Sequence, residues 1–265
     1  GLRARKALIG FANETQQEIA MLYDPDTLDL AHDPRGDSMQ PGPDEPSPRF
    51  DGVYRIDLNI DGTLDNVQFS KPPLEIAARA VASGKPFRMI GVHLKSKAPH
   101  GATNKQQERR IAIENRRKHL AQSIWLRQRV LEHLAAKESL IVLGDFNDGP
   151  GLDEFEKLFG RSGVEIVMGW DEPHETRLFD QNARLAFSKK VPAMPFTARF
   201  YLDEHGRYFN ALLDYVMVSP DLRALGPKWR IWHPFDDPAC YGVPELREAL
   251  LTASDHFPVS IDIAL

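Results

Sequence analysis

The chain has 265 residues, of which 42% are hydrophobic and 27% are charged, and this composition is typical of a globular protein with a buried core. No apolar run approaches the roughly 20 residues that cross a bilayer, and no apolar signal-peptide region follows the basic residues 1–6. The sequence therefore predicts a soluble protein and favours the cytoplasm, while the compartment itself stays open. The single cysteine, Cys240, excludes an internal disulfide framework and a cysteine-based metal site. The net charge of −5 argues against bulk electrostatic wrapping of nucleic acid and leaves room for an enzyme with a local basic groove.

Short apolar runs, separated by Gly, Pro and Asp, predict a series of β-strands. The predicted strands are residues 7–12, 18–23, 52–60, 87–94, 140–144, 212–219 and 257–265. In the last of them apolar side chains alternate with polar ones, which indicates a sheet with one buried face.

One long helix is predicted over residues 105–136, because apolar residues recur along one helical stripe. This stripe consists of Ile113, Leu120, Ile124, Leu131 and Leu134. The predicted outer face carries the basic residues Arg109, Arg110, Arg116, Arg117, Lys118, Arg127 and Arg129. Such a face is either a groove for DNA or simply a solvated surface. A second, short helix is predicted from Asp153, a good N-cap, to Phe159.

Two segments read as long loops, residues 33–50 with five prolines and residues 169–208 without a clear period. Loops of this length in a compact domain are usually functional or mobile. The chain shows no internal repeat and no sharp shift of composition, so a single mixed α/β domain over residues 1–265 is predicted.

Polar side chains follow or begin four of the predicted strands. They are His93 and Lys95, Asp145 and Asn147, Asp214, and Asp255 and His256. Each residue taken alone has a structural interpretation, as a turn cap or a buried histidine. Taken together they are what a site at one edge of a sheet requires. The carboxylate of Asp214 lies in an apolar strand and needs a partner, for which a histidine is the usual choice.

This set of residue types suits the hydrolysis of phosphate esters. An Asp can orient and deprotonate water, an Asn can hold a phosphoryl oxygen, and a His can supply a proton or bind developing charge. Hard oxygen ligands favour Mg²⁺ or Mn²⁺. The nine histidines show no zinc-type spacing, and no Gly-x-Ser-x-Gly nucleophile elbow is present, so zinc and serine-hydrolase sites are poorly supported.

The order of four motifs resembles the endonuclease/exonuclease/phosphatase superfamily over about residues 18–265. The motifs are His-Leu-Lys-Ser from position 93, Gly-Asp-Phe-Asn from 144, Leu-Asp-Tyr-Val-Met-Val-Ser from 213 and Ser-Asp-His-Phe-Pro-Val from 254. A further similarity is Phe-Ser-Lys-Pro-Pro from position 69, where Lys71 stands in the place of a phosphate-contacting Arg of deoxyribonuclease I. The resemblance implies an α/β (α+β) fold, a four-layer sandwich of two packed mixed β-sheets flanked by helices, with the site at the top.

The resemblance also implies roles for the catalytic residues. Asp145 would orient the attacking water, and Asn147 would bind the scissile phosphate. His256 would stabilise or deprotonate at the reacting centre, with Asp214 fixing its ring. His93 would contact phosphate or assist the leaving group.

Phosphate and metal binding follow from the same resemblance. Lys95 and Lys71, together with Asn147, would bind phosphate. Asp255 and Asp145 would hold Mg²⁺ or Mn²⁺. Members of the family begin with a strand ending in Asn and a later strand ending in Gln-Glu, whose Glu is the principal metal ligand.

The sequence departs from the family at this first unit. The pair Gln17-Glu18 precedes the segment that matches the family's next strand. We therefore expect the chain to lack the first strand–helix–strand unit, and an alternative role for Glu18 is pairing with His93.

The leading hypothesis is a phosphodiesterase, most specifically a nuclease that acts on DNA or RNA. The alternatives are a phosphatase, a lipid phosphodiesterase of the inositol-phosphate or sphingomyelin type, and an inactive binding scaffold with the same fold. The catalytic motifs are shared by all the enzymes, so the substrate depends on the loops at 33–50 and 169–208. The sequence indicates no partner protein.

Overall fold

The centre of the molecule is a five-stranded mixed sheet in the order β11-β8-β7-β6-β3. The computed structural model describes residues 3–12, 18–39, 45–58, 61–99, 101–149, 160–188, 194–202 and 206–265. The five strands are β3 (Leu28–His32), β6 (Leu74–Ala80), β7 (Pro86–His93), β8 (Leu140–Asp145) and β11 (Asp214–Val218). Only β7 and β8 run parallel within this sheet, and α1 (Lys105–Ala135) makes the crossover that a parallel pair requires.

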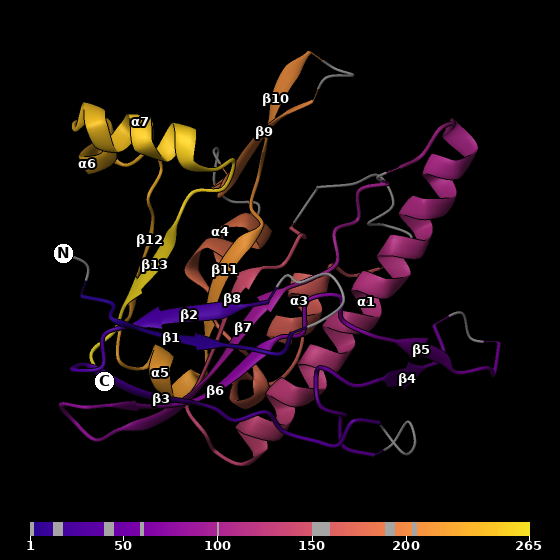
Figure 1. Ribbon diagram of the computed structural model, residues 1–265, viewed down its shortest axis with the longest axis horizontal. Coiled ribbons are helices and arrows are strands. Elements are labelled where there is room, and N and C mark those ends of the chain that lie inside the picture. The colour runs from indigo at the N-terminus through magenta and orange to yellow at the C-terminus, as the bar shows by residue number, and fades with distance from the viewer. Residues whose placement is uncertain are drawn as a thin grey trace.

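Helices cover one face of this sheet and β-ribbons cover the other (Figure 1). On the helical face lie α1, α3 (Gly163–Met168) and α4 (Gln181–Ser188). The other face packs against two separate antiparallel pairs, which are β1 (Lys6–Ile9) with β2 (Ala20–Tyr23) and β12 (Lys228–Ile231) with β13 (Val259–Asp262). The predicted fold class, mixed β-sheets flanked by helices, is confirmed.

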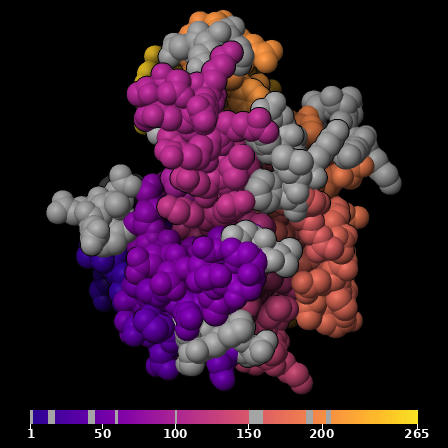
Figure 2. Space-filling model, turned by 90° about the vertical axis from the view of Figure 1, so that its right-hand side faces the viewer, coloured from indigo at the N-terminus to yellow at the C-terminus, as the bar shows by residue number. Residues whose placement is uncertain are grey.

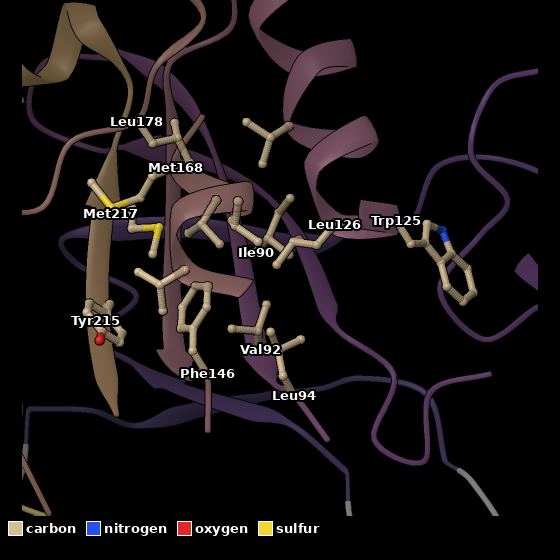
Figure 3. Close-up of a cluster of buried hydrophobic side chains, with 14 of the residues drawn as sticks. Ile90, Val92, Leu94, Trp125, Leu126, Phe146, Met168, Leu178, Tyr215 and Met217 are labelled. Atoms are coloured by element: carbon tan, nitrogen blue, oxygen red, sulfur yellow. The ribbon is translucent and has the colours of Figure 1, made fainter. Parts of the chain in front are cut away.

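The period of two along the central strands divides the hydrophobic core between these two faces. In β11, Tyr215 and Met217 face the helices, whereas Val216 and Val218 face the ribbons. Figure 3 shows the helical side, where Ile90 and Val92 of β7 lie in the same buried cluster as Met217 of β11. This rigid double-sided packing holds the ends of β7, β8 and β11 in place.

Smaller elements lie around the central sheet. They are β4 (Tyr54–Ile56), β5 (Asp65–Val67), η1 (His174–Thr176), β9 (Ala198–Leu202), β10 (Arg207–Ala211), α5 (Pro220–Arg223), α6 (Pro238–Tyr241) and α7 (Pro244–Ala253). The β9–β10 hairpin, α6 and α7 project at the same end of the molecule (Figure 1). No helix in the described ranges is long and apolar enough to cross a membrane.

Every predicted strand overlaps an observed one, namely β1, β2, β4, β7, β8, β11 and β13 in chain order. The sequence analysis missed β3, β5, β6, β9, β10 and β12, and it missed the helices after residue 160. β6 reads Leu-Glu-Ile-Ala-Ala-Arg-Ala, and its alanines carry no strand signal, so its pairing with β3 and β7 stabilises it instead.

The prediction of a loop over 169–208 is wrong, because η1, α4 and β9 lie within it. The predicted helix at 153–159 lies outside the residues that the structure describes.

The long helix α1 begins and ends where predicted, and the Asn104 side chain caps it by accepting from the Gln107 amide. Its outer face was predicted wrongly. Arg116, Arg127 and Arg129 are buried, and the predicted apolar stripe is only half-buried. The remaining members of that face, Arg109, Arg110, Arg117 and Lys118, are exposed as predicted.

Distant segments supply the partners that allow these arginines to be buried. Arg129 is fully buried, donates to the carbonyls of Ser47 and Pro48 at 3.0 Å, and lies 3.5 Å from Glu75 and 3.3 Å from Glu132. A buried guanidinium is tolerated only with such acceptors. Apart from Glu132 of α1 itself, these acceptors come from the 45–50 segment and from β6, so the sequence of the helix does not reveal them.

Candidate functional site

Three neighbouring strands present a polar side chain at the same edge of the central sheet. The register places His93 of β7 opposite Asp145 of β8, and Asp145 opposite Asp214 of β11. Because β7 and β8 run parallel and β11 runs antiparallel, the ends of the first two meet the start of the third. The sheet order therefore brings together residues that are far apart in the sequence.

Asp145 and Asn147 form a tight turn directly after β8. The backbone amide of Asn147 donates to Asp145 Oδ1 at 2.7 Å, and its side-chain Nδ2 lies 3.0 Å from both Asp145 Oδ2 and the Leu94 carbonyl. Asn147 has a left-handed backbone with φ of 48°, a conformation that Asn tolerates well. Burial raises the pKa of Asp145 to about 6, and the nearby Asp214 carboxylate acts in the same direction. In this arrangement Asn147 holds the Asp145 carboxylate in a defined orientation.

Gly144 allows this turn, because its φ of 134° is unfavourable for any other residue and a Cβ would overlap the Val92 carbonyl oxygen. We expect Gly144→Ala to destabilise the protein by about 3–5 kcal/mol, from backbone strain and steric overlap together. Gly84→Ala is the matched control, since Gly84 also has positive φ (70°) but a Cβ there meets nothing within 4 Å. That control is expected to cost only about 1 kcal/mol. Chemical denaturation measures both, and equal losses would show that the close approach to Val92 is unimportant.

Asp214 and His256 form the hydrogen-bonded pair that the sequence predicts. His256 Nδ1 lies 2.8 Å from Asp214 Oδ2. This hydrogen bond raises the pKa of His256 to about 9, although burial opposes the shift, so the ring carries a proton on both nitrogens near neutral pH. Nδ1 is occupied by Asp214, which leaves Nε2 for contact with a substrate.

Thr197 was missed by the sequence analysis, because it lies in the segment predicted as a loop. Its hydroxyl donates to Asp214 Oδ2 at 2.7 Å and accepts from the Leu213 and Asp214 amides at 3.0 Å. The Phe257 amide donates to the Thr197 carbonyl at 2.7 Å, which ties the same residue to the strand that follows His256. A lone Thr before an unpredicted strand gives no sequence signal.

His93 lies between Asp145 and Lys71. Its Nε2 is 3.4 Å from Asp145 Oδ2, and Lys71 Nζ is 3.0–3.1 Å from its two ring nitrogens. Burial and the Lys71 charge lower the pKa of His93 to about 4, so its ring is neutral. The alternative pairing of Glu18 with His93 is not present in the described part of the chain, where Glu18 is exposed.

The described residues contain one group of at least three acidic, His or Cys side chains that are close enough to hold a metal ion. It consists of Asp145, Asp214 and His256, whose ligand atoms lie within 4.8 Å of one another. Asp214 and His256 already bond to each other, so Asp145 is the carboxylate best able to accept a hard cation. Asp255 is exposed and outside this group, and it lines a neighbouring pocket of about 460 Å³ with Arg199 and others. Its metal-binding role stays a prediction.

Lys95 was predicted to bind phosphate together with Lys71. Its ammonium lies close enough to lower the pKa of Lys71, behind the larger effect of burial. Lys95 also lines a separate pocket of about 590 Å³ next to the residues that flank Lys71. The structure therefore brings both lysines to one side of the candidate site.

The chain belongs to the Endonuclease/Exonuclease/phosphatase family, because the model of that family matches residues 28–256. The resemblance inferred from the motifs is thus confirmed. A search of curated proteins found no match.

Several solved structures are similar to this chain. The human Nocturnin catalytic domain with bound sulfate has 16% identity and a TM-score of 0.42, covering 97% of this chain and 72% of its own. A mannosyl-6-phosphatase of Bacteroides thetaiotaomicron has 13% identity and a TM-score of 0.46, covering 98% and 77%. Truncated Caenorhabditis elegans TDP2 has 14% identity and a TM-score of 0.44, covering 98% and 76%. Membership of the family depends on the sequence match and not on these structural similarities.

Proposed function

We propose that this protein is a metal-dependent phosphodiesterase that uses water to cleave phosphodiester bonds, and that it acts as a nuclease on DNA or RNA. The observation that supports this most directly is the meeting of His93, Asp145, Asn147, Asp214 and His256 at one sheet edge. A base, a cationic imidazole and a carboxylate for metal are the groups that phosphate ester hydrolysis requires.

In this proposal each side chain has a task that matches its surroundings. Asp145, at the end of β8, orients the attacking water and accepts its proton. The protonated His256 ring, held by Asp214, stabilises the negative charge that develops on the phosphate. Lys71 places a second positive charge beside the same centre.

Asn147 both positions Asp145 and binds the scissile phosphate in this proposal. The side-chain Nδ2 of Asn147 donates to the Leu94 carbonyl and to the Asp145 carboxylate, so phosphate binding requires the Asn147 side chain to rotate. Asp145 and Asp255 would hold Mg²⁺ or Mn²⁺, which when bound neutralises charge on the phosphate oxygens.

A substrate panel with Mg²⁺ tests the proposal. It contains plasmid DNA, RNA, sphingomyelin, inositol phosphates and bis(p-nitrophenyl) phosphate, and an Asp145→Ala protein purified in parallel controls for contaminating nucleases. We expect the wild-type protein to cleave nucleic acid and the synthetic diester, and the variant to do neither. Release of inorganic phosphate from inositol phosphates alone would identify a phosphatase, and hydrolysis of sphingomyelin alone a lipid phosphodiesterase. No turnover of any substrate would indicate an inactive binding scaffold.

A further inference from the structure

A pocket of about 590 Å³ lies beside the proposed catalytic residues. Residues on both sides of Lys71 line it, and so does Lys95, two positions after His93. Its other wall is the α1 face that carries Lys118 and Gln122. In Figure 2 the N-terminal part of α1, in magenta, stands directly above the purple surface to which β4 and β5 belong. The pocket therefore lies next to the candidate site, between the residues that flank Lys71 and α1.

Two positive charges meet in this pocket, and among the described residues neither has an anionic partner. The side chains of Lys95 and Lys118 form no ion pair or hydrogen bond with any residue of the described ranges. Burial lowers the pKa of Lys95, and the Lys118 charge lowers it further. Among the described residues that line the pocket, the one carboxylate is Asp51, which Arg49 already holds through two hydrogen bonds of 2.6 and 2.9 Å. Like charges gathered in this way are unfavourable unless an anion binds between them.

Hydrogen bonds hold in place the backbone segments that carry the two lysines. Gln122 is buried, accepts from the Lys95 backbone amide at 2.8 Å, and donates to the Gln68 carbonyl at 3.3 Å. These bonds join α1, the chain after β7 and the chain after β5 at one point. Lys118 lies four residues before Gln122 and therefore on the same helix face.

We propose that Lys95 and Lys118 form a second phosphate-binding subsite, which binds a phosphate group of the substrate next to the one that is cleaved. This inference rests on the proposed function and adds a requirement to it, namely that the preferred substrate carries at least two phosphates. The second phosphate is either the next diester of a strand or a terminal monoester, since both present the same oxygens to an ammonium group.

Matched variants and substrates test this subsite. Lys118→Gln removes one charge from the pocket, and Arg117→Gln removes one charge from the adjacent exposed position, which does not line it. The substrates are a thymidine dinucleotide, the same dinucleotide with a terminal phosphate at either end, and a trinucleotide. We expect wild-type kcat/KM to be about tenfold higher with a second phosphate. Lys118→Gln should remove most of this preference, mainly through KM, whereas Arg117→Gln should keep it.

A measurement without turnover separates this inference from the proposed function. Binding of inorganic pyrophosphate by calorimetry should weaken about tenfold in Lys118→Gln and stay unchanged in Arg117→Gln. If the protein cleaves no ester but still binds pyrophosphate in this Lys118-dependent way, the proposed function fails and the subsite stands. If Lys118→Gln and Arg117→Gln behave alike in both measurements, the subsite is refuted. A preference for the trinucleotide alone would identify a neighbouring diester, and a preference for the phosphorylated dinucleotide alone a terminal monoester.

Discussion

Asp214→Asn is expected to lower kcat by on the order of 10²-fold or more while the fold and most substrate binding persist. The reason is the 2.8 Å hydrogen bond between Asp214 Oδ2 and His256 Nδ1, which orients the ring and raises its pKa to about 9. An amide in place of the carboxylate keeps the shape and removes the charge that stabilises the imidazolium. Steady-state kinetics on a diester substrate, with thermal unfolding measured in parallel, gives the comparison.

His256→Ala is expected to be at least as damaging as Asp214→Asn, and the double variant little worse than His256→Ala alone. Groups that act as one unit show such non-additive losses. His174→Ala and Asp262→Asn are suitable controls. They make the same two substitutions at a histidine and an aspartate that lie away from this sheet edge. Strictly additive losses of the two substitutions would mean that Asp214 and His256 act independently, and the pair would then have no common catalytic role.

Removal of divalent metal is expected to abolish hydrolysis, with a loss of at least about 10²-fold, because a cation at the phosphate supplies several kcal/mol of charge stabilisation. Activity should return with Mg²⁺ or Mn²⁺. Asp145 offers a hard carboxylate, the group within 4.8 Å contains no thiolate, and the Nδ1 atom of its one histidine, His256, is already bonded to Asp214. Activity against free metal concentration in a chelator-buffered series provides the measurement.

Two controls are needed to interpret the loss of activity without metal. The melting temperature in EDTA shows whether the loss of activity reflects unfolding instead of lost chemistry. Asp255→Asn should raise the metal concentration for half-maximal activity by at least about tenfold if Asp255 is a ligand, as the family resemblance implies. Unchanged metal dependence in Asp255→Asn would exclude that role, and full activity in excess EDTA would refute the metal requirement altogether.

The sequence alone predicted most of the side chains that meet at the candidate site. The apolar run Leu-Ile-Val-Leu before Gly144 predicts a buried strand, and Asp145 follows at its end. The carboxylate of Asp214 in an apolar strand required a partner, the family resemblance indicated His256, and the structure shows that hydrogen bond. The strand and the need for a partner were predictable because strand formation and the desolvation of a charge depend on nearby residues, whereas the choice of His256 came from the order of the family motifs.

Only the tertiary structure decided which distant residues complete the site. The order β11-β8-β7 places His93, Asp145 and Asp214 in adjacent registers, and no local pattern specifies that order. Thr197 reaches Asp214 only because its segment packs beside the strand that follows His256. The same reason explains why Arg129 of α1 was wrongly predicted to lie on an outer face. Its burial depends on carbonyls of the 45–50 segment and on Glu75. The charge pattern of a helix carries no information about acceptors so far away in the sequence.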